Sequence, residues 1–318
     1  MTPPVALPDR GRARHPAFLP PAELLRLGSL DLVARLAVEG FMAGRHRSPS
    51  RGGAHEFAEH RPYAPGDDLR RVDWKVYGRT DRWYVRESEE ETNLRATLVV
   101  DASASMGWGS PGQVAKWEYA RAVAAAVAHL LLAQQDAVGV AVFSEALDAF
   151  VPPRGGRAQR ARVLEALERA APRGITSPES PFRRLAERLP RRGLLVLVSD
   201  LLGPTERFLP GLRYFRARKH EVVVFHLLDP AERSLARLGR ASAVADVETG
   251  RVLREELEAL APGYERALAE LEGAYRAQAH DRGFDFVPLS TDEPIGVALG
   301  RWLSRRGPGR AAGNSATR

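Results

Sequence analysis

The stretch that decides the fold is RATLVVDASAS, which runs from Arg95 to Ser105. Its apolar run predicts a strand buried on both faces, as in parallel sheets. Similar runs alternate with amphipathic helical patterns down the chain, which predicts a doubly wound, mostly parallel α/β sheet covered by helices on both faces. Strands are expected at 137–144, 194–200, 221–229 and 284–290, with a returning edge strand at 147–151 and a hairpin within 242–253. Helices are expected at 116–135, 158–170, 181–189, 205–218, 259–282 and 294–305.

Polar oxygen-bearing residues follow directly where two of these strands end. If the chain stays extended after Asp101, the side chains of Asp101, Ser103 and Ser105 face one common point. Asp200 ends a second buried strand in the same way. In open α/β sheets, ligands bind beyond the carboxyl ends of the strands. Carboxylate and hydroxyl oxygens suit Mg²⁺ or Mn²⁺ and do not suit soft metals, so these residues are candidate ligands of a divalent metal. The alternative interpretation makes Ser103 and Ser105 helix-cap or turn residues.

The DASAS motif resembles the metal-ion-dependent adhesion site of von Willebrand factor A domains, whose first loop is Asp-x-Ser-x-Ser. That fold adds a threonine from a second loop and an aspartate from a third, and Thr176 and Asp200 stand in the matching order. The resemblance implies that Ser103 and Ser105 bind metal directly. Asp101 and Asp200 would act mostly through water, and Thr176 either directly or through water. The last coordination position would accept an acidic side chain from a partner protein.

A segment upstream of the motif narrows the resemblance. The stretch GGAHEFAEHRPYAPGDDLRRVDWKVYGRTDRWYVRE, residues 52–87, followed by LVVDASASM, resembles the bacterial domain-of-unknown-function 58 family. That resemblance implies a partner role beside MoxR-type AAA+ ATPases in chaperone-like assembly or maturation, without enzymatic activity of its own. One departure concerns the second loop, which is often Gly-Gly-Thr in related proteins and is Gly174-Ile175-Thr176 here. Ser177 therefore remains an alternative to Thr176 as ligand.

Composition divides the chain into four parts. Residues 1–22 and 306–318 are rich in Pro, Gly or Arg and are expected to be poorly ordered. Residues 23–93 are expected to form an extension that packs on the main domain, because the part from 48 to 93 has too little apolar content for a core of its own. Residues 94–305 are expected to form the von Willebrand factor A-like domain.

Charge and composition bound the function classes. The chain has a net charge of +7 and no Cys, which excludes disulfides and thiolate metal sites and fits a cytoplasmic protein. No stretch reads as a membrane span. Basic charge permits nucleic-acid binding as an alternative, but no nucleic-acid partner is expected, because the Arg residues are dispersed among Glu residues as on a solvated, salt-bridged surface. A Mg²⁺-dependent phosphohydrolase built on Asp101 is the enzymatic alternative, but Ser replaces the second nearby carboxylate that such chemistry would use.

Several other features have structural interpretations. The G-x-G-x-x-G stretch at 107–112 begins too far beyond its strand for a dinucleotide site and is expected to shape a loop beside the metal. Asp67-Asp68 fits turn and helix-cap chemistry, and the acidic run at 87–91 fits a solvated strand edge. His226 lies within an apolar strand and is expected to be a hydrogen-bonded core residue. Trp74, Trp83 and Tyr84 are expected to anchor the extension to the domain.

Overall fold

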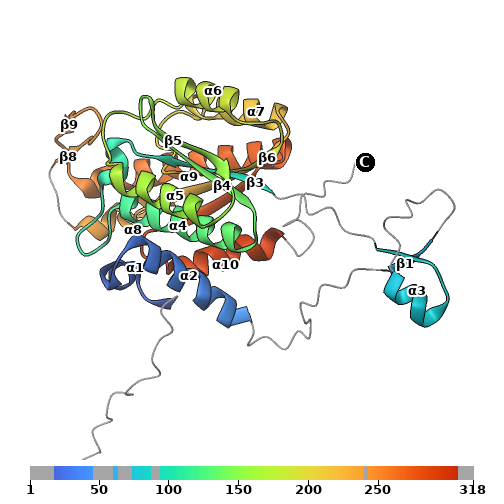
Figure 1. Cartoon of the computed structure of the whole chain (residues 1–318). Coiled ribbons are helices and arrows are strands. Elements are labelled where there is room, and N and C mark those ends of the chain that lie inside the picture. Colours follow the sequence, from blue (N-terminus) through green and yellow to red (C-terminus); the bar gives the residue numbers. More distant parts are fainter. Residues whose placement is uncertain (1–17, 46–59, 64–73, 87–93, 240–242, 307–318) are drawn as a thin grey trace, which may run out of the picture.

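Six strands form the central sheet of the chain in a computed structural model that describes residues 18–45, 60–63, 74–86, 94–239 and 243–306 (Figure 1). The strand order is β10-β7-β6-β3-β4-β5, and every pairing is parallel except that of β4 with β5. This is the doubly wound, mostly parallel sheet that the apolar runs predict. The strands are β3 (Arg95–Asp101), β4 (Ala137–Phe143), β5 (Leu147–Arg154), β6 (Gly193–Ser199), β7 (His220–Leu228) and β10 (Asp285–Ser290).

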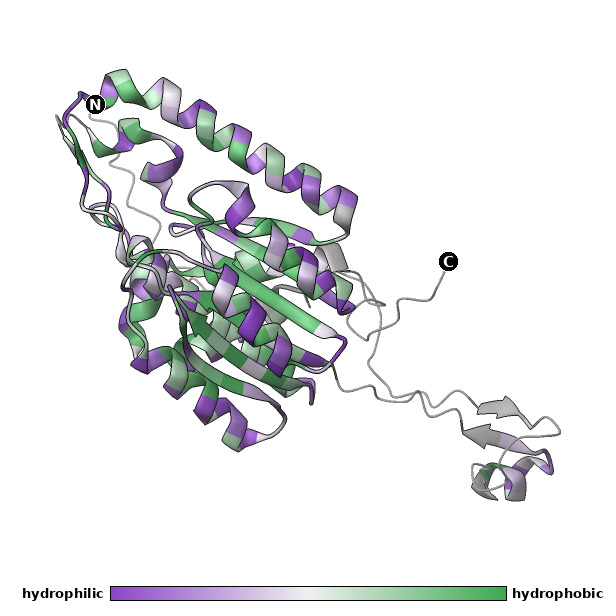
Figure 2. Cartoon of the chain, turned by 90° about the horizontal axis from the view of Figure 1, so that it is seen from above, coloured by the Kyte–Doolittle hydropathy of each residue, from purple (hydrophilic) through white to green (hydrophobic). Residues whose placement is uncertain are grey.

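Helices cover both faces of the sheet, and the hydropathy colouring shows the apolar strands between them (Figure 2). One apolar core lies between the sheet and α4 (Lys116–Ala133), α5 (Arg157–Arg169) and α10 (Ile295–Arg306). The opposite core lies against α6 (Glu179–Arg188), α7 (Leu209–Ala217) and α9 (Leu257–Arg282). Burial of strands on both faces explains why they read as continuous apolar runs.

Part of the N-terminal extension packs on this domain as expected. The chain forms α1 (Pro21–Leu24), a 3₁₀ turn η2 (Leu25–Leu27) and α2 (Leu30–Arg45), and α2 lies against α4 and α10. The buried side chains of α1 and α2 join the core on the α4 side of the sheet, so this segment completes the hydrophobic layer around α4. They are Leu24, Leu30, Val33, Ala34, Ala37 and Val38.

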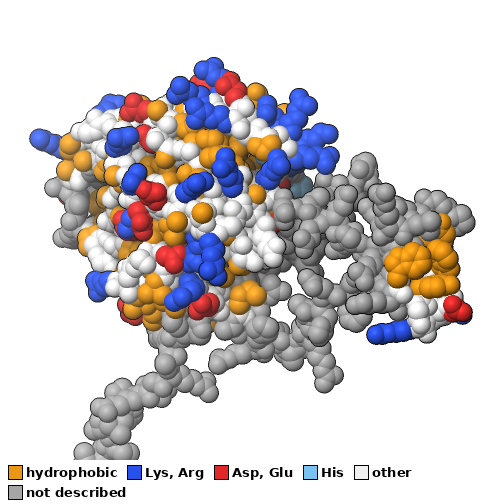
Figure 3. All heavy atoms as spheres, in the orientation of Figure 1, with side chains coloured by type: hydrophobic (Ala, Val, Ile, Leu, Met, Phe, Trp, Pro, Cys, Tyr) orange, Lys and Arg blue, Asp and Glu red, His pale blue; other side chains and the backbone are white. Residues whose placement is uncertain are grey.

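A small unit of β1 (His60–Pro62), α3 (Trp74–Thr80) and β2 (Tyr84–Arg86) forms the remainder of the described extension. Trp74 and Trp83, expected to anchor the extension to the domain, instead pack against each other at 5.9 Å between ring centroids. Both also contact Tyr77, and Trp83 contacts Tyr63, so the four rings form a local cluster with an exposed apolar surface (Figure 3). The Asp67-Asp68 turn and the acidic run at 87–91 lie outside the described residues.

The edge strand β5 is longer than predicted and ends in Pro152-Pro153-Arg154. Two irregularities interrupt its pairing with β4. Near the first of them the backbone of β5 crosses Gly139 so closely that a Cβ there would lie 2.4 Å from the carbonyl oxygen of Val151. Glycine is therefore required at that position by space alone.

The connection from β7 to β10 carries more than a crossover helix. It contains α8 (Pro230–Arg233), η6 (Leu235–Leu238) and an antiparallel hairpin of β8 (Val244–Ala245) and β9 (Val252–Leu253), followed by α9. The hairpin forms where the sequence predicts it. Within the described ranges, none of the helices combines the length and apolar character that crossing a lipid bilayer requires.

Candidate metal centre

Three loops meet at the carboxyl ends of β3 and β6, where the strand order reverses. The first follows β3, the second joins α5 to α6, and the third follows β6 through a 3₁₀ turn, η5 (Thr205–Arg207), to α7. Backbone hydrogen bonds join the first two loops, with Ala104 N–H donating to the Gly174 carbonyl at 2.9 Å and Arg173 N–H donating to the Ala102 carbonyl at 2.8 Å. This is the crevice where doubly wound sheets bind ligands.

Asp101 is the last residue of β3 and is fully buried. Its Oδ1 accepts the Ser103 N–H at 2.9 Å, and its Oδ2 accepts the Ser199 hydroxyl at 2.6 Å. Burial and the neighbouring charge of Asp200 raise the pKa of Asp101 to about 7, against the opposing effect of these hydrogen bonds. The carboxylate is thus held in place but lacks a cation of its own among the described residues.

The two serines of the motif lie together, but the expected reason was wrong. The chain does not stay extended beyond Ser103, because Ala104–Gly107 forms a 3₁₀ turn, η4. That turn brings the Ser105 hydroxyl to 3.1 Å from the Ser103 hydroxyl, and both residues are buried. Adjacent ligands of an octahedral Mg²⁺ ion lie about 2.9 Å apart, since each lies 2.0–2.1 Å from the metal. The two hydroxyls hydrogen-bond to each other, and their spacing is also close to that of two neighbouring metal ligands.

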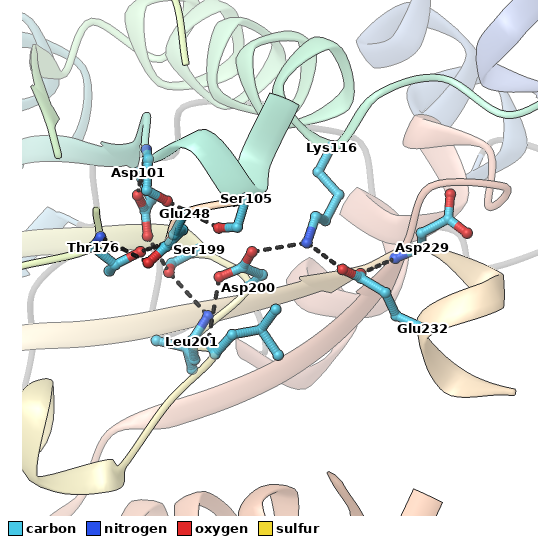
Figure 4. Close-up of polar contacts among 12 residues, drawn as sticks. Asp101, Ser105, Lys116, Thr176, Ser199, Asp200, Leu201, Asp229, Glu232 and Glu248 are labelled. Carbon is cyan, nitrogen blue, oxygen red and sulfur yellow. Dashed lines mark hydrogen bonds and ion pairs between the residues drawn. The ribbon is translucent and has the colours of Figure 1, made fainter. Parts of the chain in front are cut away.

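The second loop places Thr176 at the site. Thr176 is buried, and its hydroxyl donates to Glu248 Oε1 at 2.6 Å while its N–H donates to Glu248 Oε2 at 3.2 Å. Ser177, the alternative, donates its backbone N–H to the Ser144 carbonyl. Sequence analysis missed Glu248, although it predicted the hairpin that carries it (Figure 4).

The third loop turns sharply directly after Asp200. Leu201 has a φ of 51°, a left-handed conformation that is costly for a residue with a Cβ, and such strain concentrates at functional sites. The turn lets the Leu201 N–H donate to the Ser199 hydroxyl at 3.0 Å and the Leu202 N–H donate to Asp200 Oδ1 at 3.3 Å. Asp200 is fully buried, and its position beside Asp101 is the one predicted from the strand ends.

Lys116 is a central site residue that sequence analysis did not identify. It is the first residue of α4 and is fully buried, and its Nζ donates to Asp200 Oδ2 at 2.8 Å and to Glu232 Oε1 at 2.5 Å (Figure 4). Burial alone would raise the pKa of Asp200, but the Lys116 ammonium, helped by a hydrogen bond from Ser105, holds it below its usual range. The sequence held one indication of this role, because Lys occurs at only three positions in a chain that otherwise uses Arg.

The glycine-rich stretch at 107–112 forms a loop beside the site, and this loop positions Lys116. The Lys116 N–H donates to the Trp108 carbonyl at 3.0 Å, and a Cβ on Gly109 would lie 2.8 Å from the Val114 carbonyl oxygen. Ser110 N–H donates to Asp229 Oδ2 at 3.0 Å, which ties the loop to the end of β7. The loop therefore has a structural role in setting the start of α4.

The candidate ligands are covered from solvent. Each of the five is at most 4% exposed: Asp101, Ser103, Ser105, Thr176 and Asp200. A groove of about 690 Å³ lies nearby between β5 and α5, with Ala102, Asp148, Arg162 and Arg173 among its lining residues, but none of the five ligands lines it. Access to the ligands therefore requires the covering segments to move.

His226 connects the third loop to α9 and is the hydrogen-bonded core residue that the sequence predicts. Its Nε2 donates to the Asp200 carbonyl at 2.9 Å, and its Nδ1 lies 3.3 Å from Glu272 Oε1. Glu272 also accepts from Arg233 at 2.9 Å and from Arg276 at 2.6 Å. The contact with His226, followed by the charge of Arg233, lowers the pKa of Glu272 to about 2 despite burial.

The lowered pKa of Glu272 makes its contribution to stability depend on pH. Because the folded-state pKa lies below the unfolded value of 4.5, the stabilisation is present above pH 4.5 and is lost as the pH falls toward 2. We therefore expect Glu272→Gln to lower the free energy of urea unfolding at pH 5 and to have a much smaller effect at pH 2.5. Glu270→Gln, at an exposed position of the same helix, is the control. An equal loss at both pH values would contradict the charge-based account.

Comparison with known proteins identifies relatives along almost the whole chain. It is 31% identical over 319 residues to "Uncharacterized protein Rv1480" of Mycobacterium tuberculosis, covering 95% of this chain and 99% of that protein. The same values hold for "Uncharacterized protein Mb1516" of Mycobacterium bovis. "Uncharacterized protein MAV169" of Mycobacterium avium is 29% identical over 171 residues, covering 51% of this chain and 97% of that protein.

Similar solved structures include BatB from Bacteroides thetaiotaomicron, with a TM-score of 0.41 and 14% identity over 67% of this chain and 98% of that one. The VWA domain of SpRpn10 has a TM-score of 0.36 and 12% identity, covering 65% of this chain and 94% of that chain. The strand order of this chain is itself that of a von Willebrand factor A-like domain, with its antiparallel edge strand after the second strand. The model of the family "Protein of unknown function DUF58" matches residues 59–272, and the chain belongs to that family.

Proposed function

We propose that this protein is a divalent-metal-dependent protein-binding module, and that its metal binds an acidic side chain of a partner. The observation that carries the proposal is the pair of serine hydroxyls, 3.1 Å apart, beside the buried carboxylates of Asp101 and Asp200. Hard oxygen donors at this spacing suit Mg²⁺ or Mn²⁺. Bound metal would supply a positive centre that bridges the two proteins.

The charge balance of the site supports a divalent cation. The carboxylates of Asp101, Asp200 and Glu232 bring three negative charges, and Lys116 brings one positive charge. When all are ionised, two negative charges remain, or three when the Glu248 carboxylate on Thr176 is included, and a divalent ion would offset two of them. Ser103 and Ser105 would hold the ion directly, Thr176 would hold it directly or through water, and Asp101 and Asp200 would act mostly through water.

A binding role fits these residues better than a hydrolytic one. A nucleophilic Asp101 would have to present an oxygen to a substrate, whereas it is fully buried and both its oxygens accept hydrogen bonds. We therefore assign Asp101 to holding the metal and the first loop, and assign no catalytic step to the site.

The partner that we propose is a MoxR-type AAA+ ATPase, on the strength of the family resemblance, with the complex acting in chaperone-like assembly or maturation. We propose a cytoplasmic location for the complex, which fits a chain without Cys.

Capture of the purified AAA+ partner tests this function. Immobilised wild-type chain is expected to retain the MoxR-type ATPase from the same genome in Mg²⁺, whereas Asp101→Asn is expected to retain much less at the same Mg²⁺ concentration. Comparing variants in constant Mg²⁺ avoids the effect of a chelator on the ATPase itself. Asp281→Asn, an exposed carboxylate on α9, is the control. Equal retention by Asp101→Asn and wild type would show that the partner does not bind through the metal.

A further inference from the structure

The tip of the β8–β9 hairpin brings a carboxylate to the second loop of the site. Glu248 lies 72 residues beyond Thr176 in the chain, yet its two oxygens accept both the hydroxyl and the N–H of Thr176, at 2.6 and 3.2 Å. Figure 4 shows this carboxylate beside the Asp101 and Ser105 cluster. Across the described part of the chain, Glu248 makes no ion pair with Lys or Arg, so hydroxyl and amide donors alone hold its charge there.

The hairpin tip is built to present this residue. Asp246 accepts the N–H groups of Glu248 and Thr249 at 2.8 and 3.2 Å, and its second oxygen accepts the Thr249 hydroxyl at 2.8 Å. Gly250, with a φ of 71°, completes the turn and donates its N–H to the Asp246 carbonyl at 2.8 Å. An aspartate turn of this kind fixes the backbone locally. The position of Glu248 therefore follows from its own hairpin as well as from Thr176.

The remainder of the same connection also covers the site. Glu232 of α8 pairs with Lys116. Tyr264 of α9 interacts electrostatically with the buried charges of that pair. Burial, with the charge of Glu232 next, raises the pKa of Tyr264 to about 12. The segment between β7 and β10 thus contributes two carboxylates and a phenol around ligands that are at most 4% exposed.

We propose that Glu248 is an acidic ligand that the chain itself supplies to the metal, in the position that a partner's carboxylate would otherwise take. This inference rests on the proposed function. A partner must then displace the β8–β9 hairpin from Thr176 to reach the metal. The hairpin consequently competes with the partner for the metal, because both offer a carboxylate to the same coordination position.

Mn²⁺ alone is the probe that tests the inference. Electron paramagnetic resonance of free Mn²⁺ gives the affinity, and relaxation of water protons reports the number of water molecules on bound Mn²⁺. Glu248→Ala is expected to weaken Mn²⁺ binding by at least about 10-fold, since even groups outside the ligand shell contribute about 10–100-fold, and to raise the relaxation enhancement of the bound ion, since water replaces the lost carboxylate. Glu248→Gln keeps an acceptor for Thr176 but removes the charge. Its affinity for Mn²⁺ is therefore expected to fall, while the β8–β9 hairpin stays in place.

Glu145→Ala is the matched control. Its carboxylate accepts the Ile175 N–H at 3.1 Å on the same loop but does not bond Thr176, so this variant is expected to behave as wild type. If wild type binds Mn²⁺ and Glu248→Ala gives the same affinity and relaxation, the inference is overturned while the proposed function stands. If wild type takes up no Mn²⁺, the proposed function fails and the inference fails with it.

Discussion

Lys116→Met is expected to lower the free energy of unfolding by about 3–5 kcal/mol, the usual cost of removing one partner from a buried ion pair. Met has a similar length, so the variant keeps most of the packing and removes the ammonium. The carboxylates of Asp200 and Glu232 then remain buried without their cation, at positions now 2.8 and 2.5 Å from Lys116 Nζ. Chemical denaturation in EDTA measures the loss.

Two further variants separate lost charge balance from a general defect. Lys219→Met changes the same residue type at an exposed position and is expected to alter stability by at most about 0.5 kcal/mol. Lys116→Met/Glu232→Gln removes one of the stranded charges and is expected to recover part of the loss. Added Mg²⁺ is also expected to stabilise Lys116→Met more than wild type, because the site has gained one negative charge. Full wild-type stability in Lys116→Met would show that Lys116 does not neutralise these carboxylates.

Asp101→Asn is expected to weaken Mn²⁺ binding by about 10–100-fold, the range found when a carboxylate that acts through the ligand shell is removed. The amide has the same shape, and its oxygen can still accept the Ser103 N–H. Its NH₂ group can donate to the Ser199 hydroxyl oxygen, which has capacity for a second donor beside the Leu201 N–H. Metal affinity is therefore expected to fall without loss of the fold.

The stability of Asp101→Asn in the absence of metal provides the internal check. Asp101 is a buried carboxylate whose charged form is disfavoured by burial and by Asp200, so a neutral amide is expected to leave the metal-free protein at least as stable as wild type. Isothermal calorimetry with Mn²⁺ and urea denaturation in EDTA measure the two properties separately. Unchanged Mn²⁺ affinity would show that the ion binds elsewhere.

The sequence predicted the sheet because strands buried on both faces carry a simple signal. The runs ending at Asp101 and Asp200 were recognisable as buried strands, and the structure shows that these strands are neighbours and places both carboxylates in one crevice. The conformation between Ser103 and Ser105 was mispredicted, because a 3₁₀ turn and an extended chain can bring the same two hydroxyls together. The meeting of two side chains therefore predicts the backbone conformation between them less well than a buried apolar run predicts a strand.

Lys116 and Glu248 escaped sequence analysis for a different reason. Their partners lie 84 and 72 residues away, so neither contact leaves a local spacing pattern. Each belongs to an element that was predicted correctly, a helix start and a hairpin turn, where a charged residue ordinarily faces water. Only tertiary packing distinguishes these two charges from the many solvated ones.

The prolines of β5 restrict how this molecule can associate with others. Pro152 and Pro153 lack N–H groups, and they occupy the strand that forms one border of the sheet. Successive N–H groups of a strand point to opposite sides, so one of the two prolines removes a donor that a further strand alongside that border would use. Growth of the sheet into fibres or strand-swapped dimers is thereby disfavoured on this side of the sheet.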